Sequence, residues 1–133
     1  METKGTKEPR GTKETKGTNQ RGLLPGTVDL VILQTLTGGP LHGFAVSRSV
    51  GARSEGVLEL QDAALYQALH RMEKSGWIEA EWGISEKGKR AKYYRLTAAG
   101  ERQLQRETGF WRDYARAVFA ILEPGLGPTP EKG

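Results

Sequence analysis

The chain has 133 residues, enough for one domain with tails, and carries a net charge of +4 with a pI near 9.5. It contains no cysteine and only two histidines, His42 and His70, so disulfides and thiolate metal sites are excluded and a histidine-rich metal site is not expected. No apolar run approaches the roughly 20 residues that cross a bilayer. The basic balance favours an anionic partner such as nucleic acid, and the whole predicts a cytoplasmic protein with no membrane association.

Both ends of the sequence lack the residues that build a core. Residues 1–22 repeat short motifs such as TKGT and contain no aliphatic or aromatic side chain after Met1, which predicts a disordered basic tail. This tail either lies along DNA as a weak electrostatic arm or, as the simpler interpretation, only keeps the protein soluble. Residues 123–133 are rich in proline and glycine and predict a second, flexible tail.

The first apolar segments between the tails predict two helices and a short strand. A helix over residues 25–36 starts at a proline and stops before the sequence GGP. Residues 41–54 predict a second helix. Its apolar stripe is formed by Leu41, Phe44, Ala45 and Val50. The sequence VLEL at 57–60 predicts a strand.

The segment QDAALYQALHRMEKSG predicts a third helix, with Asp62 as its N-cap and Gly76 as its stop. Leu65, Leu69 and Met72 follow the i, i+4, i+7 spacing of a buried helix face. The remaining faces carry small and polar side chains, which is typical of a helix that enters the major groove of DNA.

The exposed face of this third helix is predicted to read DNA. Its first turn has small side chains that allow close approach, and Gln67 can both donate to and accept from adenine. The residues expected at base edges are Gln61, Asp62, Ala63, Ala64 and Gln67. The residues expected at phosphates are Tyr66, His70, Arg71 and Lys74. The alternative is an ordinary surface helix with polar decoration.

The hydrophobic period then changes from 3.6 to 2, as in β-strands. In the sequence WIEAEWG, one face carries Ile78, Ala80 and Trp82, and the other carries Trp77, Glu79 and Glu81. The sequence AKYYRL alternates again, with Tyr94 and Leu96 on one face. Two such strands around a loop that contains glycine predict a β-hairpin.

The loop of this hairpin is basic and is predicted to be a wing that contacts the DNA backbone. Cationic side chains there would release counterions from DNA, and Gly88 would let the loop turn closely. The residues expected to bind phosphate are Lys87, Lys89, Arg90 and Lys92. The alternative is a plain surface loop.

A long final helix over residues 98–122, capped by Thr97, is predicted to pair two copies of the chain. Its seam follows heptad spacing and consists of Leu104, Thr108, Trp111, Ala115, Val118 and Leu122. The alternative, that this helix folds back onto its own three-helix core, can hold in part at the same time. Trp111 is also a candidate for lining a pocket in which a planar compound stacks.

The resulting fold class is mainly α with a small β-hairpin: a winged helix-turn-helix over 23–96, followed by a dimerisation helix over 97–122. No nucleophile, base and acid stand in a catalytic pattern, and no glycine-rich phosphate loop is present. The sequence therefore predicts no enzyme activity, no cofactor and no metal. His42 is interpreted as a structural hydrogen-bonding group, and Trp77 and Trp82 are interpreted as packing residues.

Three blocks of the sequence, in this order and at this spacing, resemble the PadR family of bacterial transcriptional regulators. They are VDLVILQTLTGGPLHGF, LYQALHRMEKSGWIEAEWG and KRAKYYRLTAAGERQL, and the resemblance covers about residues 23–122. The single C-terminal helix is similar to the smaller subfamily. Where the family often has Gly-Ser, this chain has Ala63 and Ala64, and Gln67 stands at a frequent proline, so the operator sequence is expected to differ. Phe44 stands at a frequent tyrosine, which removes one hydroxyl but keeps the packing.

The resemblance implies a homodimeric repressor that binds a double-stranded DNA operator and is often released by a small aromatic effector. By similarity, DNA contacts fall on the third helix at Gln61, Ala63, Ala64, Tyr66 and Gln67, and on the wing at Lys89, Arg90 and Lys92. The competing hypothesis is a winged-helix module for protein–protein interaction, in which the long helix binds another protein.

Overall fold

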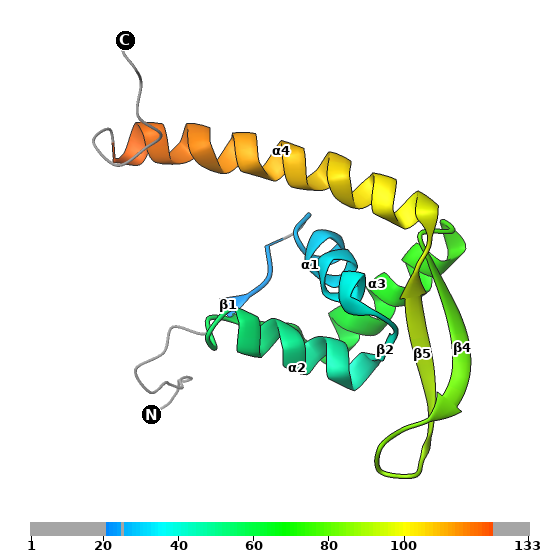
Figure 1. Cartoon of the computed structure of the whole chain (residues 1–133). Helices are drawn as coiled ribbons and strands as arrows, with labels where there is room; N and C mark the ends of the chain where they lie inside the picture. The colour runs from blue at the N-terminus through cyan, green and yellow to red at the C-terminus, as the bar shows by residue number, and fades with distance from the viewer. Residues whose placement is uncertain (1–20, 25, 124–133) are drawn as a thin grey trace, which may run out of the picture.

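The computed structural model describes residues 21–24 and 26–123, so most of the two predicted tails lies outside the described residues. The elements, in chain order, are β1 (Arg21–Gly22), α1 (Val28–Thr35), a 3₁₀ turn (Leu36–Gly38), β2 (Leu41–His42), α2 (Gly43–Arg53), β3 (Leu58–Glu59), α3 (Asp62–Lys74), β4 (Ile78–Ile84), β5 (Arg90–Leu96) and α4 (Ala98–Leu122). The architecture is mainly helical with a small antiparallel sheet, so the predicted fold class is confirmed (Figure 1).

The hydrophobic core lies among α1, α2 and α3 and under the base of the hairpin. Leu65, Leu69 and Met72 are fully buried, as their helical spacing predicts. The first helix begins at Val28 and ends at Thr35, later than the predicted start at Pro25, which lies outside the described residues. Although assigned to the predicted tail, Arg21–Gly22 pair in parallel with β3.

The apolar stripe predicted for the second helix is wrong at Leu41 and Phe44, whereas Val50 is buried as predicted. Leu41 belongs to strand β2 rather than to the helix, and Phe44 is 59% exposed. The residues of α2 that enter the core are Val46 and Val50, which are one turn apart and buried. Phe44 lies on another face, where its ring is covered in part by the Arg48 guanidinium, 5.2 Å from the ring centroid.

The third helix is confirmed, with one correction at its start. Gln61 is the N-cap residue and Asp62 is the first helical residue, where a carboxylate favours the positive end of the helix dipole. At the other end, Gly76 has a φ of +81° and its N–H donates to the Glu73 carbonyl, while Trp77 N–H donates to the Met72 carbonyl. This is the Schellman ending that glycine makes favourable.

The predicted hairpin is confirmed as β4 and β5, and the sheet has a third strand that the sequence did not reveal. β2 pairs antiparallel with the outer side of β5, which gives the strand order β2-β5-β4. Ile78 and Tyr94 bury one face of the hairpin base in the core. Trp77 precedes β4 and packs partly against the core, whereas Trp82 lies further along the hairpin and is 57% exposed.

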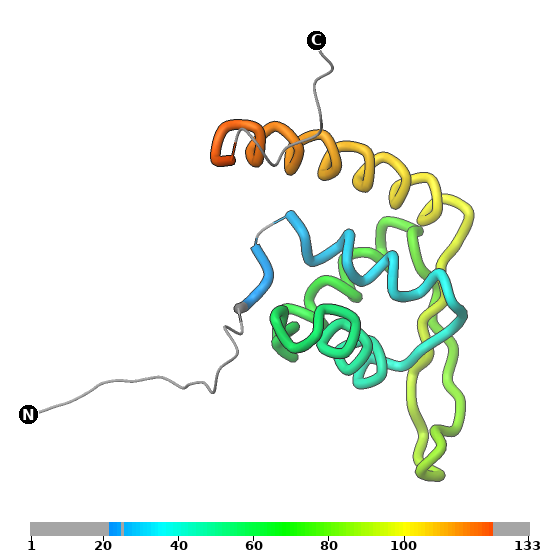
Figure 2. The backbone as a smooth tube through the Cα atoms, turned by 60° about the vertical axis from the view of Figure 1, so that its left-hand side comes forward, coloured from blue at the N-terminus to red at the C-terminus, as the bar shows by residue number. Residues whose placement is uncertain are grey.

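The long helix α4 crosses the body on the side opposite to the projecting hairpin (Figure 1) and packs on α1. Thr97 caps it, as predicted, because its Oγ1 accepts a hydrogen bond from Gly100 N–H at 3.0 Å. The tube in Figure 2 shows α4 running above α1 while the hairpin extends alone from the body. Among the described residues, no helix combines the length and apolar character that a membrane crossing requires.

Candidate nucleic-acid interface

The outward face of α3 carries nearly all of the side chains predicted to read DNA. Gln61, Ala63 and Gln67 are exposed near its start, and Ala64 is half-buried against the core. The predicted phosphate contacts are also exposed, namely Tyr66, His70, Arg71 and Lys74. Since Leu65, Leu69 and Met72 fix the opposite face in the core, the helix presents this polar face in one orientation.

The connection between α2 and α3 is held by short side-chain hydrogen bonds. Ser54 Oγ accepts from Leu58 N–H at 3.0 Å, and Ser47 Oγ donates to the Leu60 carbonyl at 3.1 Å. The chain reverses at Glu55 and Gly56, whose φ angles are +55° and +82°. These contacts fix the segment that leads into the first turn of α3.

Tyr66 lies directly against the start of α2. A Cβ added to Gly43 would overlap the end of the Tyr66 ring, so glycine at this position lets the two helices approach closely. This explains the glycine of the sequence LHGF. It also places the Tyr66 hydroxyl at the edge between α2 and α3.

Two of the predicted phosphate-binding cations already have carboxylate partners. Arg71 donates to Asp29 of α1 at 2.5 Å, and this hydrogen bond raises the pKa of its guanidinium. Lys92 Nζ lies 3.6 Å from a Glu73 carboxylate oxygen on α3. These pairs tie α3 to α1 and the hairpin to α3, so both cations have a structural role irrespective of DNA.

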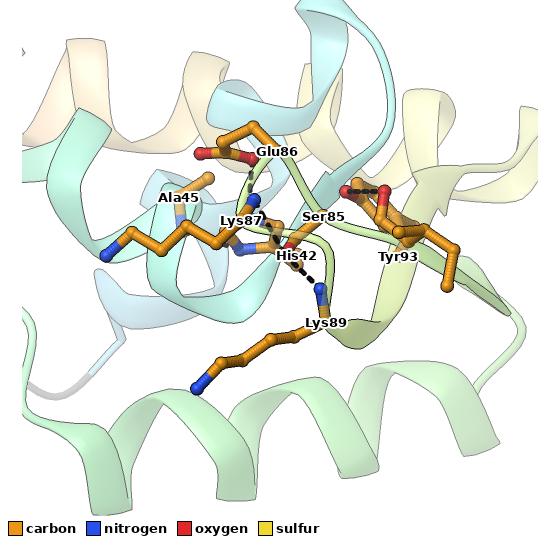
Figure 3. Close-up of polar contacts among 8 residues, drawn as sticks. His42, Ala45, Ser85, Glu86, Lys87, Lys89 and Tyr93 are labelled. Atoms are coloured by element: carbon orange, nitrogen blue, oxygen red, sulfur yellow. Dashed lines mark hydrogen bonds and ion pairs between the residues drawn. The ribbon is translucent and has the colours of Figure 1, made fainter.

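The wing tip is an ordered turn built around Ser85 and Gly88, and Figure 3 shows Ser85 beside Lys87 and Lys89. Gly88 N–H donates to the Ser85 carbonyl at 2.8 Å, and Ser85 N–H donates to the Lys89 carbonyl at 2.7 Å. Ser85 Oγ also accepts from the backbone N–H groups of Lys87 and Lys89, each at 3.3 Å. Gly88 has a φ of +76°, in the left-handed region that hairpin loops of this length use. The backbone is thereby set, and the lysine side chains are left exposed.

Tyr93 and His42 brace the tip from the side of β2. The Tyr93 hydroxyl donates to the Ile84 carbonyl at 3.2 Å. The ring of Tyr93 meets His42 edge-on, with centroids 5.4 Å apart. It also lies against Gly83, where an added Cβ would meet the ring at 3.1 Å. The end of the hairpin is therefore held from the outside by one aromatic side chain.

His42 has the structural role that the sequence predicts, and it also touches the wing. Its Nδ1 accepts a hydrogen bond from Ala45 N–H at 3.1 Å, which caps α2. In the neutral ring this bond leaves the proton on Nε2. That atom lies 3.7 Å from the Glu86 carboxylate at the wing tip (Figure 3).

The strand register places a row of large side chains on the hairpin face that continues from the core. Ala80 pairs with Tyr94, Trp82 with Lys92 and Ile84 with Arg90. Further out on this face, the Arg90 guanidinium lies 4.4 Å from the centroid of the Trp82 ring. Burial raises the pKa of the Tyr94 hydroxyl, with smaller contributions from Glu73 and Tyr66, so Tyr94 is neutral at physiological pH.

The predicted pairing seam on α4 divides into buried and open parts. Leu104 is buried in the protein's own core, and Thr108, Trp111 and Val118 are half-buried, so the fold-back alternative holds for the first turns. Ala115 and Leu122 are exposed. A second apolar stripe, displaced by one residue from the seam, was missed by the sequence analysis and consists of Phe110, Tyr114, Ala117 and Ile121.

Trp111, the predicted effector-pocket residue, lies at the edge between these stripes. Its ring is 3.7 Å from the position that a Cβ on Gly26 would take, so it covers the chain just before α1. It also meets Phe110 and Tyr114 edge-on, with centroids 5.9 and 5.4 Å away. Phe110 and Tyr114 stack on each other one helical turn apart. In the part of the chain that the structure describes, no group of three metal-binding side chains occurs.

Comparisons with known proteins agree with this geometry. The profile of the transcriptional regulator PadR-like family matches residues 32–106, more than half of the chain. A transcriptional regulator from Clostridium thermocellum has the same fold, with a TM-score of 0.67 and 26% identity, over 74% of this chain and 95% of that one. A PadR family transcription regulator from hypervirulent Clostridium difficile R20291 gives a TM-score of 0.63 and 30% identity, over 72% of this chain and 98% of that one.

A curated relative extends the match at the level of sequence. An uncharacterized protein of Lysinibacillus sphaericus is 29% identical over 102 residues, which cover 76% of this chain and 93% of that protein. The family profile runs from the middle of α1 through α2, α3 and the wing to the first turns of α4. On this evidence the chain belongs to the PadR-like family of transcriptional regulators.

Proposed function

We propose that this PadR-like regulator is a repressor that binds a double-stranded DNA operator as a homodimer. The observation that carries the proposal is that α3 and the wing line one cleft. Tyr66 of α3 and Lys87, Arg90 and Lys92 of the wing face the same space. A reading helix with a cationic hairpin beside it is the arrangement that winged helix-turn-helix proteins use on duplex DNA.

The roles within this interface follow from exposure and chemistry. Gln61, Ala63 and Gln67 are exposed at the start of α3 and would meet base edges in the major groove, with Ala64 behind them. Tyr66, His70 and Lys74 would contact phosphates beside the groove. Lys87, Lys89 and Arg90 would contact the backbone under the wing. Because Arg71 and Lys92 already pair with Asp29 and Glu73, they are expected to add less to phosphate binding.

Homodimerisation through α4 is supported by the apolar side chains that this helix exposes. Large apolar residues are open to solvent along its second half, and Ile121 is 80% exposed. The exposed residues of the predicted seam, Ala115 and Leu122, and the second stripe together form a broad apolar face, which a second copy would cover. A two-fold dimer would hold two reading helices about 34–36 Å apart, one turn of B-DNA.

Selection of duplexes from a random pool, followed by fluorescence anisotropy with the full chain, tests this function. A palindromic site with half-sites one turn apart is expected. The logarithm of affinity should fall with the logarithm of salt concentration by about 0.9 for each phosphate neutralised. Gln67→Ala should change base preference, whereas Lys89→Ala should weaken all duplexes alike. A protein that stays monomeric at micromolar concentration and binds no duplex at low salt contradicts the proposal.

Repression and effector release have their own test. A reporter gene with the selected site over its promoter should be silenced by the protein. Activation of the reporter would mean that the protein is an activator and not a repressor. The ring cluster around Trp111 supports a small aromatic compound as the releasing effector. Aromatic acids and phenols added to the DNA complex should release it, and Trp111→Ala should remove that response. Because Trp111 also belongs to the predicted seam, the oligomeric state of the variant is measured together with its DNA binding.

A further inference from the structure

A cleft of about 350 Å³ separates the wing from the start of α2. Its lining is rich in cations, with Arg48 from α2 and Lys87, Arg90 and Lys92 from the wing. Exposed aromatic rings of Phe44, Tyr66 and Trp82 complete its walls. Among the residues that line this cleft, one side chain is acidic, Glu86. A cleft with this balance favours an anion.

Both guanidinium groups that line this cleft lie against aromatic rings. Arg48 Cζ lies 5.2 Å from the centroid of Phe44 on α2, and Arg90 Cζ lies 4.4 Å from the centroid of Trp82 on the wing. A ring face holds the guanidinium plane in place while its N–H groups at the edge stay able to donate. Both arginines are therefore oriented before any ligand arrives.

Glu86 carries the negative charge at the mouth of this cleft. Its carboxylate lies 3.7 Å from His42 Nε2, in the contact drawn in Figure 3. Its pKa is lowered, first by a hydrogen bond that its carboxylate accepts from the backbone N–H of the same residue, against a smaller opposing effect of desolvation, and then by His42 and Arg48. A lowered pKa keeps the carboxylate ionised at neutral pH. The wing tip thus places the Glu86 carboxylate at the same cleft as Arg48 of α2.

We propose that this cleft is a phosphate-binding site of the DNA interface, in which Arg48 and Arg90 bind one backbone phosphate and Glu86 is an internal anion that the phosphate must displace. The inference rests on the proposed function and adds to it. Phosphate and carboxylate groups are both attracted by arginine, and Glu86 lines the same cleft as Arg48 and Arg90, so the two anions compete for the positive charge of this cleft. Arg48 thereby becomes a DNA-binding residue outside α3 and the wing.

The position of the cleft supports DNA as the source of the phosphate. Tyr66 of the reading helix forms one wall and Lys87 of the wing forms another, so the two elements proposed to hold DNA border the same space. A duplex held by α3 and the wing would bring a backbone strand across the start of α2. Binding of a free small anion would not require both α3 and the wing.

The effect of Glu86→Gln on DNA affinity shows which role Glu86 has. Tighter binding means that Glu86 competes with the phosphate, and weaker binding means that it supports the DNA-binding position of the wing. Glu86→Gln removes the competing charge, so affinity for the selected duplex should rise about three- to fivefold, the range of a partly exposed ion pair. The matched control is Glu81→Gln, which makes the same change of net charge in strand β4, where Glu81 pairs with Tyr93 and lines a different hollow. Glu81→Gln should change affinity less than twofold.

Either of two results would overturn the role of Glu86. Equal effects of Glu86→Gln and Glu81→Gln would mean that only overall charge matters. Weaker binding by Glu86→Gln would mean that the contact with His42 supports the wing in its DNA-binding position. Thermal unfolding of each variant, compared with the wild-type chain, shows whether a change in affinity reflects a change in folding.

Arg48 is tested against Arg53, an exposed arginine in the last turn of the same helix that lines a different groove. Arg48→Ala should weaken binding about tenfold and lower the salt slope by about 0.9, the value for one phosphate. Arg53→Ala should leave both nearly unchanged. Phe44→Ala, which keeps the charge but removes the ring, should weaken binding with the salt slope retained, and Phe44→Tyr should restore it.

The outcomes separate this inference from the proposed function. If the wild-type chain binds no duplex, the proposed function is wrong and the cleft has no DNA to bind. If the wild-type chain binds and Lys89→Ala weakens it, but Arg48→Ala behaves like Arg53→Ala, the function stands and the phosphate site is wrong.

Discussion

The two halves of α4 differ in what covers them. In the first half, Gly100 and Leu104 are buried against the start of β4 and the helical core, and Thr97 anchors the first turn. In the second half, Phe110 and Ile121 point into solvent. The first half of α4 therefore packs inside the protein, whereas the apolar side chains of the second half are largely exposed in the described chain. Packing in the core thus limits the first half, and it does not limit the second half in the same way.

The largest expected effect is at the tightest point of the buried half. A Cβ on Gly100 would overlap the Trp77 carbonyl and crowd Leu96, and this carbonyl is held in place because it accepts a hydrogen bond from Thr97 N–H. Gly100→Ala should therefore lower the free energy of unfolding by at least about 3 kcal/mol. Urea unfolding followed by far-UV circular dichroism measures the loss.

Gly109 provides the matched control, since it lies on the same helix with no atom within 4 Å of an added Cβ. Gly109→Ala should stabilise the protein by about 0.5–1 kcal/mol, because alanine favours the helix. Equal effects at positions 100 and 109 would show that helix propensity, and not the contact with Trp77, governs both sites.

A pair of leucines compares the two halves directly. Leu104 is 8% exposed and Leu122 is 67% exposed. Leu104→Ala should destabilise the chain by about 2–3 kcal/mol through the cavity that it leaves. Leu122→Ala should change the stability of the monomer by less than about 0.5 kcal/mol. Thermal unfolding at protein concentrations where the chain is monomeric measures both, and a large effect at Leu122 would mean that the second half is covered intramolecularly.

The open half is expected to matter for association. The double substitution Phe110→Ser with Ile121→Ser should raise the dimer dissociation constant at least about tenfold, because the lost apolar burial occurs in both copies. Sedimentation velocity over a dilution series measures this change. Arg112→Ser, on a different face of the same half, should leave the constant nearly unchanged, and an equal effect there would remove the apolar stripe as the interface.

The smallest expected effect concerns the cap of α4. Thr97 Oγ1 donates to the Gly76 carbonyl at 2.6 Å and accepts from Gly100 N–H. Thr97→Ala should cost about 1 kcal/mol of stability. Thr97→Ser, which keeps the hydroxyl, should recover most of it. If the serine variant is as unstable as alanine, the methyl group rather than the hydrogen bonds holds the junction.

Periodicity predicted the strongly amphipathic elements and the direction of their faces. Helix α3, the hairpin and α4 follow from apolar spacing and from Gly76 and Thr97 as stop and cap signals. The spacing could not give depth. Trp82 lies on the predicted hairpin face, but the core ends near Ala80 and the strand continues beyond it, so the ring is exposed.

The contacts that position the candidate site join residues that are distant in sequence. Strand β2 has two residues, too few for a visible alternation, and forms only because β5 offers an edge. The contacts of Glu86 with His42 and of Lys92 with Glu73 depend on how the wing folds onto α2 and α3. Arg48 lies in α2, whose buried face follows Val46 and Val50 rather than Phe44, so the sequence did not predict which side of the helix carries Arg48.

The junction at Gly76, Trp77 and Thr97 has a mechanical consequence for the proposed dimer. Thr97 N–H, at the start of α4, donates to the Trp77 carbonyl at 3.1 Å, in the segment that directly follows α3. Helix α4 has 25 residues and is therefore about 37 Å long. This junction attaches its first turn to the end of α3. In the proposed dimer, a change of about 5° in the angle between the two α4 helices would shift one α3 by roughly 3 Å relative to the other, which is about the rise of one base pair of DNA.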